Sequence, residues 1–320
     1  MKRRDFIKTA SIIAPSIGLF PADLSSIARE IVPGNLEKRV LGRSGKMLTM
    51  LGFGGIIVRD MQPEDASVIV KFAIDAGVNY FDIAPAYGDA ILKLGPALEP
   101  YRKDVFLSCK TGGRTKEDSR KDLGKSLKDM RTDHFDLYQL HAVTTLKDVD
   151  TILGKGGAME TFREAREEGK IKLIGFSAHS VEAAMTLMNR FDFDTILFPV
   201  NYATWYAGNF GPQVLALAQE KKMGILAIKA MARRPWPEGA DKSKYPRCWY
   251  EPFTDEENIR MGLRFTLSHP VTAALPSGEA ELYRIALNLR NKLEPLSNAE
   301  VDAIKAKGLN GNPIFKYPLA

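Results

Sequence analysis

The sequence predicts an α/β protein whose eight parallel strands close into a (β/α)8 barrel, the TIM-barrel architecture. From residue 47 onward, short apolar runs alternate with longer amphipathic segments, which is typical of βα units. Gly77, Gly169 and Gly224 lie just past the ends of amphipathic segments, where a helix needs a left-handed C-cap. The length of 320 residues is one that a single barrel domain commonly reaches.

A doubly wound sheet is the competing fold class. It would need a glycine-rich phosphate loop with Gly-x-Gly-x-x-Gly spacing directly after its first strand. The only candidate, Gly52–Gly55, lacks that spacing. The barrel is therefore favoured.

The expected elements follow one another along the chain. A hairpin over Lys38–Leu48, with Gly42 and Gly45 in its turn, is expected to cap the bottom of the barrel. The expected strands are Thr49–Phe53, Asn79–Ile83, Val105–Lys110, Phe135–His141, Ile171–Ser177, Thr195–Val200, Gly224–Ile228 and Val271–Leu275. The expected helices are Pro63–Ala76, Asp118–Met130, Met159–Glu168, Val181–Met188, Gln213–Lys222, Glu256–Leu267 and Glu279–Leu293.

Composition narrows the function classes. Hydrophobic residues make up 45% of the chain and charged residues 26%, as in soluble globular proteins. The net charge of +6 is spread along the chain without a basic, aromatic-rich stripe, so nucleic-acid binding is not expected. The two cysteines form neither a disulfide framework nor a metal site, and no metal is expected.

The first 28 residues resemble a twin-arginine export signal. Arg3 and Arg4 precede a weakly apolar run over Ile12–Phe20, and Ser26 and Ala28 make a small-residue cleavage point. We expect residues 1–28 to be removed and residues 29–320 to form the barrel in the periplasm, delivered by the twin-arginine export machinery, without a stable membrane anchor. A basic tail on a cytoplasmic protein is the alternative.

Four polar residues follow three neighbouring predicted strands, at the end of the barrel where function gathers. Asp82 ends the second strand and Tyr87 follows it, while Lys110 and His141 end the third and fourth. A Lys ammonium favours the phenolate and is expected to lower the pKa of Tyr87, a carboxylate keeps the Lys charged, and a His orients a substrate oxygen. Together they predict a general acid for a carbonyl that receives a hydride. Strand alternation turns Cys109 toward the helices, where it is expected to be buried and inert.

These residues carry a resemblance to the aldo-keto reductase family. The segment Phe81–Gly88 resembles the family signature in which the Asp and Tyr of the catalytic tetrad stand five apart. The similarity runs from about residue 38 to 290, and its other motifs are Leu41–Gly45, Leu51–Gly55, Ser126–Lys128, Asp136–His141, Glu168–Ile171 and Ile174–Ser177. The resemblance implies NAD(P)H-dependent carbonyl reduction in a barrel, with Asp82, Tyr87, Lys110 and His141 as the tetrad and Tyr87 as the proton donor.

The resemblance also implies a cofactor site for NADP or NAD. Ser177 lies where the family's serine hydrogen-bonds the nicotinamide carboxamide. The asparagine that usually follows it is Ala178 here, and His179 can take its place. Asn201 stands where the family usually has Gln. Lys229 is expected either to neutralise the pyrophosphate or to be a solvated residue at a strand end.

The segment after the last strand departs most from the family. Ser277 and Gly278 are retained, with the amides at the start of a helix available to an anion. Glu279 would repel a 2′-phosphate, and Arg284 is the nearby basic candidate. NADP, NAD and the absence of a nucleotide therefore all stay open.

Residues 229–255 form a long connection that is rich in aromatic residues. The segment after the sixth strand also contains aromatic residues. These aromatic residues are expected either to line a pocket for a flat, cyclic or sugar-like substrate or only to pack the loop against the barrel. They are Trp205, Tyr206, Trp236, Tyr245, Trp249 and Tyr250.

We therefore expect an oxidoreductase that reduces an aldehyde or ketone, or oxidises the alcohol. The alternative is an exported ligand-binding barrel with a vestigial tetrad.

Overall fold

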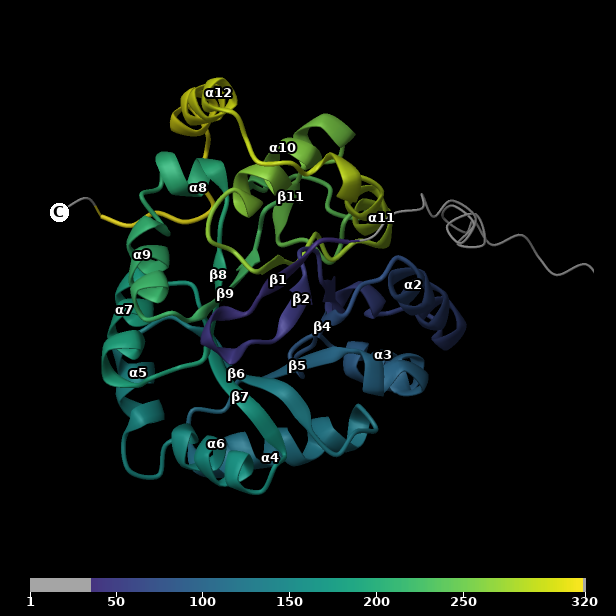
Figure 1. Ribbon diagram of the computed structural model, residues 1–320, viewed down its shortest axis with the longest axis vertical. Helices are drawn as coiled ribbons and strands as arrows, with labels where there is room; N and C mark the ends of the chain where they lie inside the picture. Colours follow the sequence, from purple (N-terminus) through teal and green to yellow (C-terminus); the bar gives the residue numbers. More distant parts are fainter. Residues whose placement is uncertain (1–35, 319–320) are drawn as a thin grey trace, which may run out of the picture.

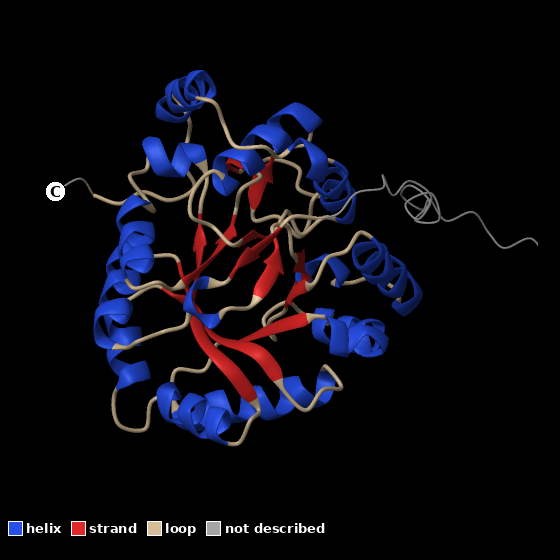
Figure 2. Ribbon diagram, viewed as in Figure 1, coloured by secondary structure: helices blue, strands red, loops and turns tan. Residues whose placement is uncertain are grey.

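The barrel itself is as predicted. The structure, a computed structural model, describes residues 36–318. Eight parallel strands follow one another in sequence order around a centre that helices surround (Figure 1, Figure 2). Each strand overlaps one of the eight predicted runs, which confirms the fold class. The strands are β3 (Phe53–Gly54), β4 (Tyr80–Asp82), β5 (Phe106–Thr111), β6 (Phe135–Val143), β7 (Ile171–Ala178), β8 (Thr195–Pro199), β9 (Gly224–Ile228) and β12 (Ala273–Ala274).

The barrel closes where the first and last strands meet. Leu51 and Ala274 form a parallel bridge, and the Gly52 N–H donates to the Ala274 carbonyl at 3.0 Å. Only glycine fits at position 52, because a Cβ there would lie 2.4 Å from the Tyr80 ring. Both seam strands, β3 and β12, are shorter than predicted because pairing across the seam is limited to this bridge and its neighbouring hydrogen bonds.

The predicted hairpin caps the bottom of the barrel. Strands β1 (Lys38–Val40) and β2 (Met47–Thr49) pair antiparallel. Gly42, at φ 49°, lies so close to the start of β9 that a Cβ there would be 2.3 Å from the Gly224 nitrogen. Leu41 is fully buried in the apolar cluster inside the barrel. The hairpin therefore seals the end opposite to the polar strand ends.

The helices cover the outside of the sheet, and the apolar side chains between the two layers form the main core. All seven predicted helices are present, and the last one continues into the short 3-10 helix η4 (Arg290–Lys292). They are α2 (Pro63–Asp75), α4 (Lys116–Asp129), α6 (Ala158–Glu167), α7 (Val181–Arg190), α9 (Pro212–Glu220), α10 (Glu256–Leu267) and α11 (Ala280–Asn288).

Several helices were not predicted. In α3 the internal Pro96 and its neighbour Gly95 hide the helical pattern, yet Gly95 is required because a Cβ there would lie 2.2 Å from the Asp129 carbonyl oxygen. The additional helices are η1 (Gly42–Ser44), η2 (Gly55–Val58), α3 (Ala90–Leu98), η3 (Glu99–Asp104), α5 (Leu146–Leu153), α8 (Tyr202–Tyr206) and α12 (Asn298–Leu309).

The long connection after β9 folds into a second hairpin. Strands β10 (Ala232–Pro235) and β11 (Tyr250–Pro252) pair antiparallel. Figure 1 shows β11 beside α10, away from the β1–β2 hairpin. The connection thus returns to the barrel instead of extending into solvent.

Residues 1–28, the expected export signal, lie outside the described residues. Among the helices of residues 36–318, none combines the length and the apolar character needed to cross a membrane.

Candidate active site

The parallel strands bring the predicted catalytic residues to one end of the barrel. Asp82 ends β4, Lys110 lies in β5 and His141 lies in β6, while Tyr87 follows β4. Alternation along β5 turns Lys110 into the barrel and Cys109 the other way. Cys109 is fully buried, as predicted, and burial raises the pKa of its thiol to about 12.

A buried ion pair organises this end of the barrel. The Lys110 Nζ donates to Asp82 Oδ1, and both side chains are 1% exposed. Nζ also lies 3.4 Å from the Ile83 carbonyl oxygen. Burial alone would lower the pKa of Lys110, but the adjacent Asp82 carboxylate outweighs it, so the pKa is raised above its ordinary value. The amine is therefore held charged at every physiological pH.

Tyr87 lies within reach of that ammonium. Its hydroxyl accepts a hydrogen bond from Lys110 Nζ at 3.4 Å. Burial raises the pKa of Tyr87, and Lys110 opposes this effect without overcoming it. The sequence-based expectation of a lowered pKa is thus wrong for the net shift, because desolvation of the phenolate outweighs the ammonium. The phenol is protonated at rest, as a proton donor must be.

His141 completes the group. Its ring meets the Tyr87 ring edge to face, with the centroids 5.7 Å apart and an interplanar angle of 88°. Burial, reinforced by the charge of Lys110, lowers the pKa of His141 to about 3. A neutral imidazole can donate a hydrogen bond from one nitrogen and accept at the other, which suits it to orient a carbonyl oxygen.

The backbone that carries His141 is irregular. The ladder between β6 and β7 shifts register between Leu140 and Val143, and Ala142 has φ 51°. Arg114 Nη2 donates to the His141 carbonyl at 2.9 Å, and Ser177 Oγ accepts from the Ala142 N–H at 2.8 Å. These contacts fix a bulge that aims the imidazole. The sequence analysis missed Arg114, because its role depends on the fold.

Two further residues hold the Asp82 carboxylate. Its Oδ2 accepts from Gln139 Nε2 at 3.1 Å and from the Tyr80 hydroxyl at 3.3 Å. The sequence analysis missed both, although a signal was present: Tyr80 stands two residues before Asp82 and Gln139 two before His141, on the same strand faces. A carboxylate with three donors is fixed in one orientation.

The four residues border one small cavity of about 160 Å³. Arg247, Trp249 and Tyr250, from the connection after β9, contribute to its lining. Four of the seven predicted cofactor-binding residues line the same cavity: Ser177, His179, Lys229 and Gly278. The sequence analysis therefore found most of the groups at this mouth of the barrel.

The other three predicted cofactor-binding residues do not line the cavity. Asn201 caps α8, accepting from the Ala203 N–H at 3.0 Å and donating to the Ala232 carbonyl. Ser277 Oγ lies 3.0 Å from Cys248 Sγ, and Arg284 lies half-buried on α11. Asn201 and Ser277 thus have partners in the loops around the barrel mouth, and their part in cofactor binding stays a prediction.

Glu279, which was expected to repel a 2′-phosphate, forms an ion pair with Arg247. Its carboxylate accepts from the Arg247 N–H at 2.6 Å and from Arg247 Nη1 at 3.1 Å. Arg247 Nε in turn donates to the Arg59 carbonyl at 2.9 Å. This ion pair joins the connection after β9 to the start of α11.

The aromatic residues divide between the two expected roles. Trp249 and Tyr250 line the cavity. Trp236 packs the connection down, with its Nε1 donating to the Cys248 carbonyl at 2.8 Å, and Tyr245 is buried. Trp205 stacks on His269, with ring centroids 4.1 Å apart, and Tyr206 packs on Phe265.

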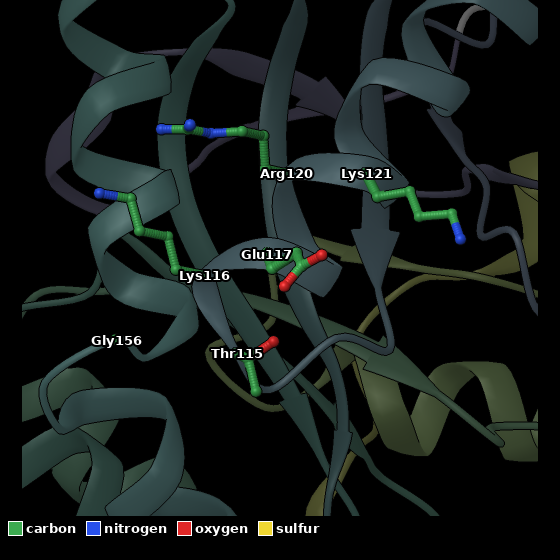
Figure 3. A pocket seen from close by; sticks show the side chains of 6 residues that line it. All are labelled: Thr115, Lys116, Glu117, Arg120, Lys121 and Gly156. Atoms are coloured by element: carbon green, nitrogen blue, oxygen red, sulfur yellow. The ribbon is translucent and has the colours of Figure 1, made fainter.

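A larger hollow of about 620 Å³ lies at the surface beside the start of α4 (Figure 3). Two of its three cations form ion pairs: Lys116 Nζ lies 2.5 Å from the Glu164 carboxylate, and Arg120 pairs with the same group. Figure 3 shows Lys121 directed away from both. None of the tetrad residues lines this hollow, so the reaction chemistry belongs to the smaller cavity.

A (β/α)8 barrel with a phenol, an ammonium, a carboxylate and an imidazole at one cavity defines a class of barrel enzymes that move a proton on or off a carbonyl oxygen. Residues 50–247 match the sequence model of the Aldo/keto reductase family, more than half of the chain. The chain belongs to this family and is an NAD(P)H-dependent oxidoreductase that acts on a small carbonyl or alcohol.

Individual relatives agree with this assignment. The chain is 23% identical over 310 residues to the uncharacterized oxidoreductase YqkF of Bacillus subtilis, covering 85% of this chain and 96% of the relative. It is 26% identical over 211 residues to the L-galactose dehydrogenase of Arabidopsis thaliana, covering 61% and 65%. It is 24% identical over 221 residues to a D-threo-aldose 1-dehydrogenase of Pseudomonas, covering 58% and 66%.

A solved structure shows the same fold. The holo form of the aldo-keto reductase AKR11C1 from Bacillus halodurans superposes with a TM-score of 0.67 at 24% identity, covering 85% of this chain and 96% of that one.

Proposed function

We propose that Tyr87 is the general acid in carbonyl reduction, and the general base in alcohol oxidation, on a sugar-like substrate. The observation that carries this proposal is the position of Lys110, whose single ammonium contacts both the Asp82 carboxylate and the Tyr87 hydroxyl beside the cavity. Tyr250 is a second phenol in the described cavity wall, but of the two tyrosines it is Tyr87 whose hydroxyl accepts a hydrogen bond from Lys110.

The proposed roles follow from the contacts. Tyr87 gives its proton to the carbonyl oxygen, and the phenolate left behind is stabilised by Lys110. Asp82 keeps Lys110 charged and in place, held by Tyr80 and Gln139. His141, neutral, hydrogen-bonds the carbonyl oxygen and orients it toward the phenol. A preorganised donor and cation of this kind supply most of the stabilisation of a developing oxyanion.

The cavity wall fits the nicotinamide of a bound cofactor. When bound, NADPH or NADH supplies the hydride that reduces the carbonyl carbon. His179 Nε2 is buried without a hydrogen-bond partner, and Ser177 Oγ lies on the same wall, so both are suited to a carboxamide. The cavity of about 160 Å³ is smaller than the ~300–1,000 Å³ typical of ligand pockets. We infer that Trp249 and its neighbours shift when a dinucleotide enters.

The sugar-like substrate is inferred from the aromatic lining and from relatives. Trp249 and Tyr250 line the cavity, and aromatic side chains commonly pack against the apolar C–H side of flat, cyclic ligands. Two relatives are named as dehydrogenases of L-galactose and of D-threo-aldoses. An aldose, or the lactone or alcohol that corresponds to it, is therefore the substrate class to test.

We expect the chain from residue 29 onward to hold one dinucleotide per polypeptide. Native mass spectrometry, on the protein as purified and after separate additions of NADPH and NADH, measures this directly, and the mass added identifies the dinucleotide. Turnover of a panel of aldoses, followed as the loss of reduced nucleotide, completes the test. A folded chain that gains no mass from either nucleotide contradicts the proposal and favours a ligand-binding barrel with an unused tetrad.

We also propose that the protein is exported to the periplasm by the twin-arginine machinery. The support is the order of residues 1–28, with Arg3 and Arg4 before an apolar run and a small-residue cleavage point. Because this route carries folded proteins, the nucleotide would travel inside the barrel.

Replacing both Arg3 and Arg4 with Lys is expected to abolish export and leave the uncleaved protein in the cytoplasm. Cell fractionation measures the location, and sequencing of the exported protein is expected to begin at Arg29. The Lys2→Gln variant, outside the arginine pair, serves as the control. Export that survives the double replacement argues against the twin-arginine route.

A further inference from the structure

Lys229 is an unusual residue in this cavity. It directly follows β9, and its backbone has φ 71°, a left-handed conformation that favours glycine. Its side chain lines the cavity together with Tyr87 and His141. A lysine that simply extended into solvent at a strand end would have no reason to adopt this backbone conformation beside the cavity. The position of Lys229 therefore indicates a role in the cavity.

The ammonium of Lys229 has aromatic neighbours and no counter-ion. Its Nζ lies 4.8 Å from the centre of the Trp249 ring and 5.3 Å from that of Tyr250. In the part of the chain that the structure describes, no carboxylate lies within ion-pair distance of it. Asp82, which lines the same cavity, is already engaged by Lys110, and Glu279, which follows the cavity residue Gly278, is engaged by Arg247.

The other groups around Lys229 do not compensate its charge. Those that interact with it electrostatically are Lys110, Cys248, His141 and His179. Burial lowers the pKa values of His141 and His179 to about 3 and about 4, and it raises that of Cys248 to about 11, so these three are neutral. The cavity thus carries one positive charge in excess.

A half-buried cation without a counter-ion is costly to maintain, and a ligand anion relieves that cost. Lys229 lines the same cavity as the Tyr87 phenol and the His141 imidazole. The anion that balances its charge therefore belongs to the molecule that reacts in this cavity. We propose that Lys229 binds a carboxylate of the substrate, so that the enzyme acts on carbonyl compounds that carry a carboxylate, such as uronic acids. This inference rests on the proposed function, since it takes the substrate carbonyl to lie at Tyr87.

The test compares substrates that are alike in shape but differ in charge. The pairs are 4-carboxybenzaldehyde with 4-carbamoylbenzaldehyde, and D-glucuronate with D-glucose. We expect the wild-type enzyme to prefer the acid of each pair by about 10- to 100-fold in kcat/KM, the range expected for a hydrogen bond to a charged group. Lys229→Met is expected to remove that preference through KM, and Lys229→Arg to retain most of it.

The matched control is Lys244→Met. Lys244 also stacks on a tyrosine, with its Nζ 5.2 Å from the Tyr245 ring centre, but it is exposed and not part of the cavity. We expect it to leave the acid preference unchanged. Titration of NADPH and NADH onto each variant shows whether Lys229 instead serves a phosphate of the cofactor.

The pH profile gives a second readout. Burial lowers the pKa of Lys229 to about 8, with the charge of Lys110 adding to the shift and Cys248 opposing it. Lys229 is therefore charged below about pH 8 and neutral above it. The kcat/KM for the acid is expected to fall as the pH rises through about 8. The kcat/KM for the amide is expected to lack this fall and to depend only on the titration of the other groups that act on both substrates.

The outcomes separate this inference from the proposed function. Calorimetric binding of 4-carboxybenzyl alcohol against 4-carbamoylbenzyl alcohol needs no turnover, and acid-selective binding that Lys229→Met abolishes supports the subsite even in an inactive protein. An active enzyme without an acid preference overturns it. So does a Lys229→Met variant that loses nucleotide affinity and keeps the acid preference.

Discussion

Replacing Tyr87 with Phe is expected to abolish turnover, with kcat falling by about 10²- to 10⁴-fold. The change removes a single hydroxyl whose only hydrogen bond in the described structure is the one from Lys110 at 3.4 Å. The aromatic ring, and its edge contact with His141, are retained. The proton donor is thus lost while the shape of the cavity wall is kept. Steady-state kinetics and nucleotide titration measure the two effects separately, and nucleotide affinity is expected to be nearly unchanged.

Tyr206→Phe provides the matched control. Tyr206 is also a half-buried tyrosine packed on an aromatic ring, but it lies on α8 and not at the cavity. It is expected to retain full activity. If Tyr87→Phe retained full activity as well, Tyr87 would not be the proton donor, and the assignment of all four residues would fail with it.

The second large effect concerns the pair of Asp82 and Lys110. Asp82→Leu leaves a buried ammonium with only the Ile83 carbonyl at 3.4 Å and the Tyr87 hydroxyl as partners. Breaking a buried pair in this way costs about 3–5 kcal/mol of unfolding free energy. Lys110→Met leaves the Asp82 carboxylate with its bonds from Tyr80 and Gln139 but without a cation, and is expected to destabilise the fold to a similar degree.

The double variant, Asp82→Leu with Lys110→Met, is expected to recover most of the lost stability, because replacing a whole buried ion pair with apolar residues is often neutral or stabilising. It is expected to remain inactive, since nothing then stabilises the Tyr87 phenolate. Urea unfolding of the wild type, the two single variants and the double variant gives the coupling energy. Additive losses in the double variant would show that the two groups do not act as a pair.

Lys71→Met is the control for this series. Lys71 pairs with Asp75 at 2.6 Å on the surface of α2, with side chains 61% and 40% exposed. Since an exposed pair in water contributes little, the variant is expected to leave the unfolding free energy nearly unchanged.

The helices show where the sequence pattern predicts an element correctly and where it misses one. α10 lies at its predicted bounds because its apolar positions repeat with the helical period and Asp255 caps its first turn. α3 was missed because Gly95 and Pro96 interrupt that period, and only the close approach of α4 explains why glycine is required there. Local patterns therefore predict an element only where no tertiary contact dictates its residues.

The predicted cofactor-binding side chains show the same limit, because local sequence patterns do not reveal their hydrogen-bond partners. Asn201 is expected to bind the cofactor from its position at the end of β8, and only the structure shows that its carboxamide also caps α8. Trp249 and Tyr250 face Lys229 from a segment about twenty residues further along the chain. Contacts between groups so far apart in sequence depend on how the connection folds back.

By itself, the sequence determined the barrel and the place of Asp82, Lys110 and His141 near its strand ends, with Tyr87 in the loop after β4. This was possible because strand alternation and the parallel arrangement of strands send every second residue and every strand end to known places. Only the tertiary structure decided the protonation of Tyr87, the partners of Asn201 and Ser277, and the absence of a counter-ion for Lys229 within the described residues. Those properties depend on desolvation and on through-space distances, which arise only when segments remote in sequence pack together.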